Sequence, residues 1–113
     1  MITHRNALSV TPGGPPLRIY LSQDDADFKL IFDLYSTIGT FTVQSGSTVK
    51  LQGRHWDRTP FEVSGTISGT VVTIQGNKSL TNRPGDSVAE LVITHGSKQL
   101  ATANFFLMIE SKA

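Results

Sequence analysis

The sequence contains no cysteine, no excess charge of either sign and no long apolar run. The absence of cysteine excludes a disulfide framework, a thiolate nucleophile and a thiolate metal site. Ten Lys and Arg residues nearly balance nine Asp and Glu residues, so no field of one sign attracts nucleic acid or an anionic membrane. The N-terminus also lacks the pattern of a signal peptide. We therefore expect a protein made in the cytoplasm, with neither nucleic acid nor a membrane as its partner.

The residues that are abundant are typical of a β-sandwich. A chain of 113 residues is long enough for one domain with a hydrophobic core. Ten glycines accompany many Thr, Ser and Val residues, a composition that favours strands and tight turns over helices. Only residues 79–82 indicate a single helical turn. We predict an all-β, immunoglobulin-like sandwich of about seven strands.

Alternation of apolar and polar residues predicts where the strands lie. Every second residue is Phe or Leu between 28 and 34, and every second residue is apolar between 101 and 109. Residues 61–68 are predicted to form one continuous strand. The predicted core positions are Leu17, Ile19, Leu21, Phe28, Leu30, Phe32, Leu34, Val49, Leu51, Phe61, Val63, Ile67, Ala101, Ala103, Phe105, Leu107 and Ile109.

The two ends of the chain are predicted to lie outside the sandwich. Residues 1–16 end in "TPGGPP", which lacks most backbone donors and resists both helix and sheet. We interpret them as a flexible arm that is either free or placed on a neighbouring subunit. The sandwich is predicted to span residues 17–110, with residues 111–113 as a tail or the start of a linker.

Acidic and histidine residues give weak signals for chemistry. The aspartates of "DDAD", residues 24–27, have the ligand type that calcium prefers, but the twelve-residue calcium-loop pattern is absent. A polar turn before a strand is the simpler interpretation. His4, His55 and His95 are scattered, and no hydrolase or zinc-protease motif accompanies them. We predict no catalytic residue, no metal, no cofactor and no enzymatic activity.

Residues 54–58, "RHWDR", are the segment most typical of a binding site. Trp56 is the only tryptophan, and Arg54 and Arg58 flank it. Three interpretations stay open. Trp56 closes one end of the core, or it joins the two arginines in a protein interface, or it stacks on sugars or bases.

The last predicted strand carries a second possible interface. Phe106 and Met108 project from its face opposite the predicted core. Two large apolar side chains on that face indicate either that it is covered within the fold or that it meets a partner.

Four segments occur in an order that matches a known family. They are "LSQDDADFKLIFDLYS", "SGSTVKLQGRHWDRTPF", "SGTVVTIQG" and "SLTNRPGDSVAELVITHGSKQLATANFFLMIE". Together they resemble the N-terminal immunoglobulin-like domain of phage baseplate upper proteins and related minor tail proteins, over residues 17–110. One departure is the turn "RHWDRTP", where many relatives have an Asp-Gly tip, so the resemblance assigns no role to Trp56.

The resemblance implies a non-enzymatic virion component. It would be an adaptor of the phage tail or baseplate that docks a host-recognition assembly, with other phage structural proteins as partners. Such proteins form homo-oligomers, often trimers. A capsid decoration or head-fibre domain is the alternative within the virion. A carbohydrate-binding module that uses Trp56 is the alternative from a different class.

Overall fold

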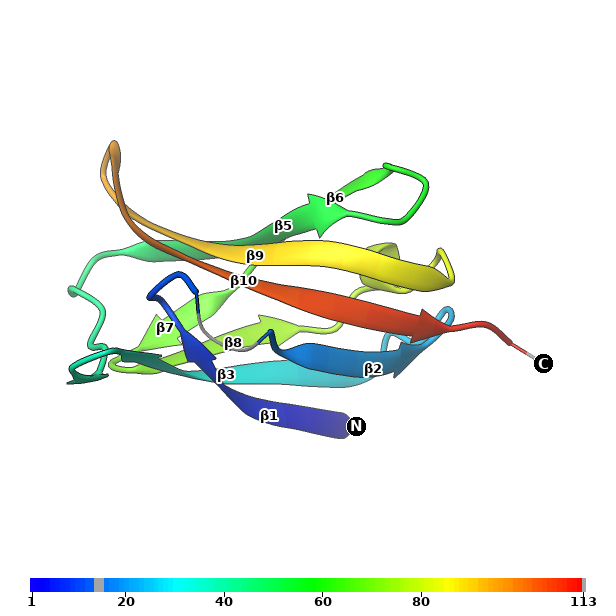
Figure 1. The fold of residues 1–113 in the computed structure, drawn as a ribbon, viewed down its shortest axis with the longest axis horizontal. Coiled ribbons are helices and arrows are strands. Elements are labelled where there is room, and N and C mark those ends of the chain that lie inside the picture. The colour runs from blue at the N-terminus through cyan, green and yellow to red at the C-terminus, as the bar shows by residue number, and fades with distance from the viewer. Residues whose placement is uncertain (14–15, 113) are drawn as a thin grey trace.

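The protein is a sandwich of two sheets. A computed structural model describes residues 1–13 and 16–112. The first sheet has the order β1-β3-β8-β7, with β4 paired to the end of β3, and the second has the order β2-β10-β9-β5-β6. Figure 1 shows the two sheets as stacked layers. The predicted all-β sandwich is confirmed, although the described residues form ten strands rather than about seven.

The strands follow the chain with short connections, and one 3-10 turn interrupts them. This turn, η1 at Lys78–Leu80, overlaps the single helical turn predicted for residues 79–82 but begins one residue and ends two residues earlier. The strands are β1 (Ile2–Ser9), β2 (Arg18–Ser22), β3 (Phe28–Ser36), β4 (Gly39–Thr40), β5 (Thr48–Arg54), β6 (Pro60–Ser64), β7 (Thr66–Ser68), β8 (Val71–Gln75), β9 (Gly85–His95) and β10 (Lys98–Glu110).

The predicted arm is wrong for half of its length, because residues 2–9 form a strand. β1 pairs in parallel with β3 over its whole length, from Ile2 opposite Phe28 to Ser9 opposite Tyr35. Only Leu8 of β1 is buried in the core, so the strand is held mainly by its backbone ladder. β2, the next strand after β1, belongs to the other sheet. Residues 14–15 of the predicted arm and residue 113 of the predicted tail lie outside the described residues.

Residues 61–68 are not one strand, because the chain changes sheet at Gly65. β6 pairs with β5 in the second sheet, whereas β7 pairs with β8 in the first. A Cβ atom at Gly65 would collide with Ile74 and lie 2.8 Å from the carbonyl oxygen of Thr73. Glycine therefore permits the close approach that this crossing requires.

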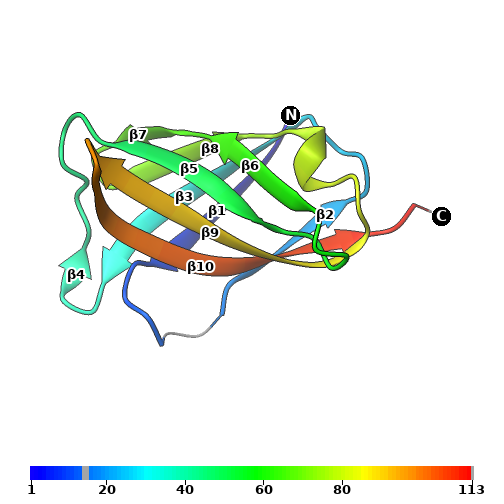
Figure 2. The ribbon, with the colours of Figure 1, turned by 90° about the horizontal axis from the view of Figure 1, so that it is seen from above.

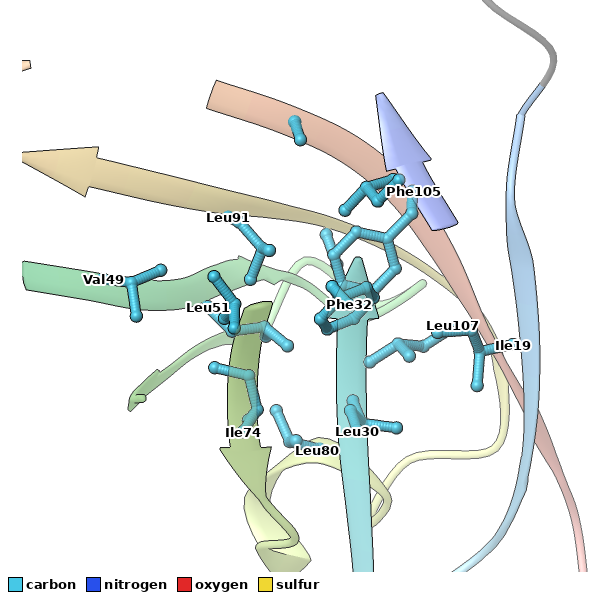
Figure 3. Close-up of a cluster of buried hydrophobic side chains, with 14 of the residues drawn as sticks. Ile19, Leu30, Phe32, Val49, Leu51, Ile74, Leu80, Leu91, Phe105 and Leu107 are labelled. Carbon is cyan, nitrogen blue, oxygen red and sulfur yellow. The ribbon is translucent and has the colours of Figure 1, made fainter. Parts of the chain in front are cut away.

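The core lies between the sheets and confirms the predicted inward positions. In Figure 3, Phe32 from β3 and Phe105 from β10 meet at its centre, with ring centroids 5.0 Å apart. The predicted positions of β2, β3 and β5 are all buried. Val63, Ile67 and Ala101 are partly buried against the same cluster. Because the inner faces fill this core, any interaction surface must lie on an outer face or on the loops.

Candidate functional site

The outer face of the second sheet brings together the interface residues that the sequence predicted separately. Strand register places Arg18, Phe106, Val88, Arg54 and Pro60 in one row across β2, β10, β9, β5 and β6. These side chains point away from the core, because the neighbouring residues Ile19, Phe105, Ala89 and Phe61 are buried. Figure 2 looks down onto this sheet.

A second row lies next to the first, toward the C-terminal end of β10. It places Tyr20 opposite Met108, and Met108 opposite Asp86. Tyr20 and Val88 are 58% and 55% exposed, and Phe106 and Met108 are half-buried. Large apolar side chains therefore lie side by side here, and no layer of residues 1–13 or 16–112 covers them.

Trp56 lies two residues beyond the end of β5, next to the start of β9, and is open to solvent. Its side chain is 64% exposed, which overturns the interpretation that it closes the core. The ring lies directly against Gly85, because a Cβ atom there would come within 2.8 Å of Trp56 Cδ1. Gly85 also has φ of 112°, which side-chain-bearing residues rarely adopt. Because Gly85 has no side chain, the indole can pack against the start of β9.

The turn that carries Trp56 is fixed by several hydrogen bonds. The backbone N–H of Arg58 donates to the carbonyl of His55 (2.8 Å), and that of His55 donates to the carbonyl of Thr59 (2.9 Å). The Asp57 carboxylate accepts from the Thr59 N–H at 3.0 Å and from Arg83 Nε at 3.1 Å. The pKa of Asp57 is lowered, chiefly by a hydrogen bond with the Thr59 side chain. The hydrogen bond from the Thr59 backbone and the hydrogen bond and positive charge of Arg83 lower it further. The indole is therefore presented on a turn that is already ordered.

His55 anchors the same turn to the core. It is only 3% exposed, and its ring lies 4.7 Å from that of Phe61. Nδ1 lies 3.0 Å from Ser87 Oγ, and Nε2 lies 2.9 Å from the carbonyl oxygen of Ser79, to which it donates. Both ring nitrogens are thus occupied inside the protein. His55 holds the turn in place, while the residue after it faces solvent.

Three arginines lie beside the apolar side chains. Arg18 lies over the ring of Phe106, with its guanidinium carbon 5.7 Å from the ring centroid. This is a cation–π contact. Arg54 Nη1 donates to the carbonyl of Arg58 at 3.1 Å. Arg58 itself is exposed on the turn and has φ of 69°. We name this surface the Trp56 face, comprising Tyr20, Trp56, Val88, Phe106 and Met108 with Arg18, Arg54 and Arg58.

A groove extends from the Trp56 face across the second sheet. Its volume is about 1020 Å³, and Arg54, Pro60, Val88 and Phe106 belong to both its lining and the first row. Gln52, Glu62, Glu90 and Asn104 continue the lining toward the middle of the sheet. The loop after β1, with Pro12 and Pro16, forms one wall. Trp56 and Met108 do not line the groove but lie beside its end.

The acidic loop that the sequence singled out is held by basic groups of the protein. The Asp24 carboxylate lies 2.6 Å from Lys112 Nζ, and this hydrogen bond lowers the pKa of Asp24. Asp27 lies 3.5 Å from the N-terminal amine. Among the described residues, no three acidic or histidine side chains converge as metal ligands would. His4 and His95 lie on separate strands, β1 and β9.

Sequence reasoning missed Arg18, Tyr20 and Val88 as members of this site. The alternation in β2 already placed Arg18 and Tyr20 on its polar side, so the signal was present for that strand. Their proximity to Phe106 and Met108 depends on the parallel pairing of β2 with β10. Such pairing joins segments about as far apart as the chain allows, and no local pattern reports it.

Comparison with known proteins shows a likeness in fold. No protein-family model matches the chain, and no curated protein sequence matches it. Among solved structures, the N-terminal domain of ORF48 from phage TP901-1 superposes with a TM-score of 0.73 and 12% sequence identity. The match covers 97% of this chain and 99% of that one. The chain therefore has the fold of this phage domain. None of the described residues forms a helix long and apolar enough to cross a membrane.

Proposed function

We propose that the protein is a non-enzymatic structural module of a bacteriophage virion, an adaptor of the tail or baseplate that docks a host-recognition assembly. The observation that carries this proposal is the match in fold to a phage domain over 97% of this chain and 99% of the other. Because the match spans both chains almost completely, it concerns the whole arrangement of strands. The order of sequence segments, which resembles phage baseplate upper proteins, supports the same role independently.

The physical character of the molecule suits a docking role. Tyr, Trp and Arg are the residues that dominate binding energy in protein interfaces, and all three occur on the Trp56 face. The turn beneath Trp56 is ordered by its own hydrogen bonds, so little conformational entropy is lost on binding. In the virion the partners are other phage structural proteins, and the protein acts within a homo-oligomer such as a trimer.

Immunogold labelling of particles of the source phage, viewed by negative-stain electron microscopy, tests this proposal. An antibody against the protein is expected to place gold at the tail tip. Gold over the head would move the proposal to a capsid decoration or head-fibre role. Bare particles, when the same antibody also fails to detect the protein in dissociated particles, would refute a virion role.

Carbohydrate binding is a second candidate, because the open position of Trp56 is what a stacking platform for sugars requires. A glycan array probed with the protein and with Trp56→Ala separates the two. Glycan binding that the variant loses would favour the carbohydrate-binding module. No glycan binding by either protein would refute it.

A further inference from the structure

The Trp56 face carries positive charge that the protein itself does not neutralise. Elsewhere, Arg5 forms an ion pair with Asp33 and Arg83 forms one with Asp57. Within residues 1–13 and 16–112, Arg18, Arg54 and Arg58 have no such carboxylate partner. The two rows of this face contain one carboxylate, that of the exposed Asp86. The face therefore combines large apolar side chains with a net positive charge.

Two carboxylates lie farther along the groove, and only one of them is paired with a cation. Glu62 lies 3.1 Å from Lys50 Nζ, whereas Glu90 accepts a hydrogen bond of 2.9 Å from the neutral amide of Gln52 and keeps its negative charge. Among the described residues of the face and groove, three arginines without a carboxylate partner therefore stand against two carboxylates without a cation, Asp86 and Glu90. Arg54 lines the groove at the end where Val88 and Phe106 lie, and Arg18 lies over the ring of Phe106. A ligand that enters the groove from this end meets arginine and aromatic side chains first.

A second copy of this chain is a poor occupant of the same face. Two copies related by a two-fold axis would bring the unpaired arginines of one face against those of the other. Like charges placed opposite each other across an interface cost several kcal/mol. The charge thus favours a partner of opposite sign over a copy of this chain related by a two-fold axis.

We propose that the Trp56 face binds an acidic segment of a partner protein. The apolar side chains of this segment pack on Trp56 and Phe106, and its Asp or Glu residues pair with Arg18, Arg54 and Arg58. The inference rests on the proposed docking function, for which it names the surface and the chemistry of the partner. Arginine suits this role, since its guanidinium pairs bidentately with carboxylates and also stacks on aromatic rings.

Selection of a random peptide library on the immobilised 113-residue protein tests this inference. The selected peptides are expected to combine Asp or Glu with large apolar residues, and added salt is expected to weaken their binding. For one such peptide, Trp56→Ala is expected to weaken binding at least about tenfold, as at other interface hot spots. Arg54→Glu and Arg58→Glu are expected to weaken it comparably.

Lys98→Glu is the matched control for these charge reversals. Lys98 is exposed on the second sheet at the start of β10, at the opposite end from the Trp56 turn, and the substitution changes the net charge by the same amount. Binding by this variant should equal that of the unchanged protein. Circular dichroism and thermal melting show whether each variant is folded. If one of the two arginine variants is unfolded, Arg18→Glu is measured in its place.

Three results would overturn the inference: selected peptides that are neutral or basic, acidic peptides that Lys98→Glu weakens as strongly as Arg54→Glu, or no selected peptide. These results are separable from those on the proposed function. If the antibody labels the particles but the library yields no acidic peptide, this inference is refuted and the proposed function stands. If neither intact nor dissociated particles are labelled while acidic peptides still need Trp56 for binding, the virion role is refuted and the binding surface stays assigned.

Discussion

The two faces of the second sheet are both rich in large apolar side chains, but only one of them is covered. On the inner face, Phe105 and Leu107 of β10 are fully buried against the first sheet. On the outer face of the same strand, Phe106 and Met108 are half-buried beside the exposed Tyr20 and Val88. The inner residues hold the sheets together by removing apolar surface from water. The outer residues contribute much less in this way, so their presence is better explained by a partner than by the fold.

The largest expected difference is between two neighbouring phenylalanines of β10. Phe105→Ala should lower the free energy of unfolding by about 3–5 kcal/mol, because it empties the centre of the core. Phe106→Ala removes a half-buried ring in contact with Arg18 and should cost less than about 1.5 kcal/mol. Urea unfolding of both variants measures this. Equal losses would show that the outer face is part of the stabilising core.

A smaller difference is expected between His55 and Trp56. His55→Ala should cost about 2–3 kcal/mol, because it leaves the Ser79 carbonyl and the Ser87 hydroxyl without their partner and removes packing on Phe61. Trp56→Ala should cost less than about 1 kcal/mol, since the ring is largely in solvent. Thermal unfolding of the two variants compares them. A large loss for Trp56→Ala would contradict its assignment to a binding surface.

Gly85→Ala should disturb the position of Trp56 without emptying the core. The new Cβ atom would lie 2.8 Å from Trp56 Cδ1, at a residue with φ of 112°. We expect a stability loss of about 1–2 kcal/mol and a shift in tryptophan fluorescence. Because the sequence has one tryptophan, this emission reports on Trp56 alone. Unchanged emission would mean that Gly85 does not determine the position of the indole ring. Gly69→Ala, at another glycine of positive φ with open space around it, is the control for backbone strain.

The smallest effect is expected in the pH dependence of stability. The pKa of Asp57 is lowered in the folded protein, so its stabilising effect is present above the unfolded pKa of about 4 and is lost as the pH falls below that value. Asp57→Asn should therefore lose less stability between about pH 6 and pH 2.5 than the unchanged protein. Urea midpoints across this range measure the difference. Asp25→Asn, at an exposed aspartate, is the control, and identical pH profiles for Asp57→Asn and the unchanged protein would contradict the expectation.

The alternation of the sequence predicted the core strands because each of them buries one side. In β3, for example, every second residue is fully buried. β1 was not predicted, because only its residue Leu8 is buried and its sequence therefore shows no alternation. The strand is defined by its parallel pairing with β3. The crossing at Gly65 was missed because Phe61, Val63 and Ile67 keep the same alternation while the sheet changes. A period of two tells which side of a strand is buried, not which sheet it joins.

The site was predicted residue by residue but not as one surface. The sequence singled out Arg54, Trp56, Arg58, Phe106 and Met108 from their types and positions. Their association depends on the register that joins β10 to β9 and β9 to β5. The packing of the Trp56 ring against β9 involves Gly85, far along the chain. Both are properties of the assembled sheet, so local sequence could not supply them.

Hydroxyl-radical footprinting of the protein, free and within intact phage particles, tests most directly whether a partner covers the Trp56 face. Oxidation of Trp56 and Met108 is expected to fall in particles, whereas oxidation of Tyr35, which is partly exposed on the first sheet, should change little. Equal oxidation of Trp56 in particles and in the free protein would contradict the account, because the outer face of the second sheet would then be open in the virion.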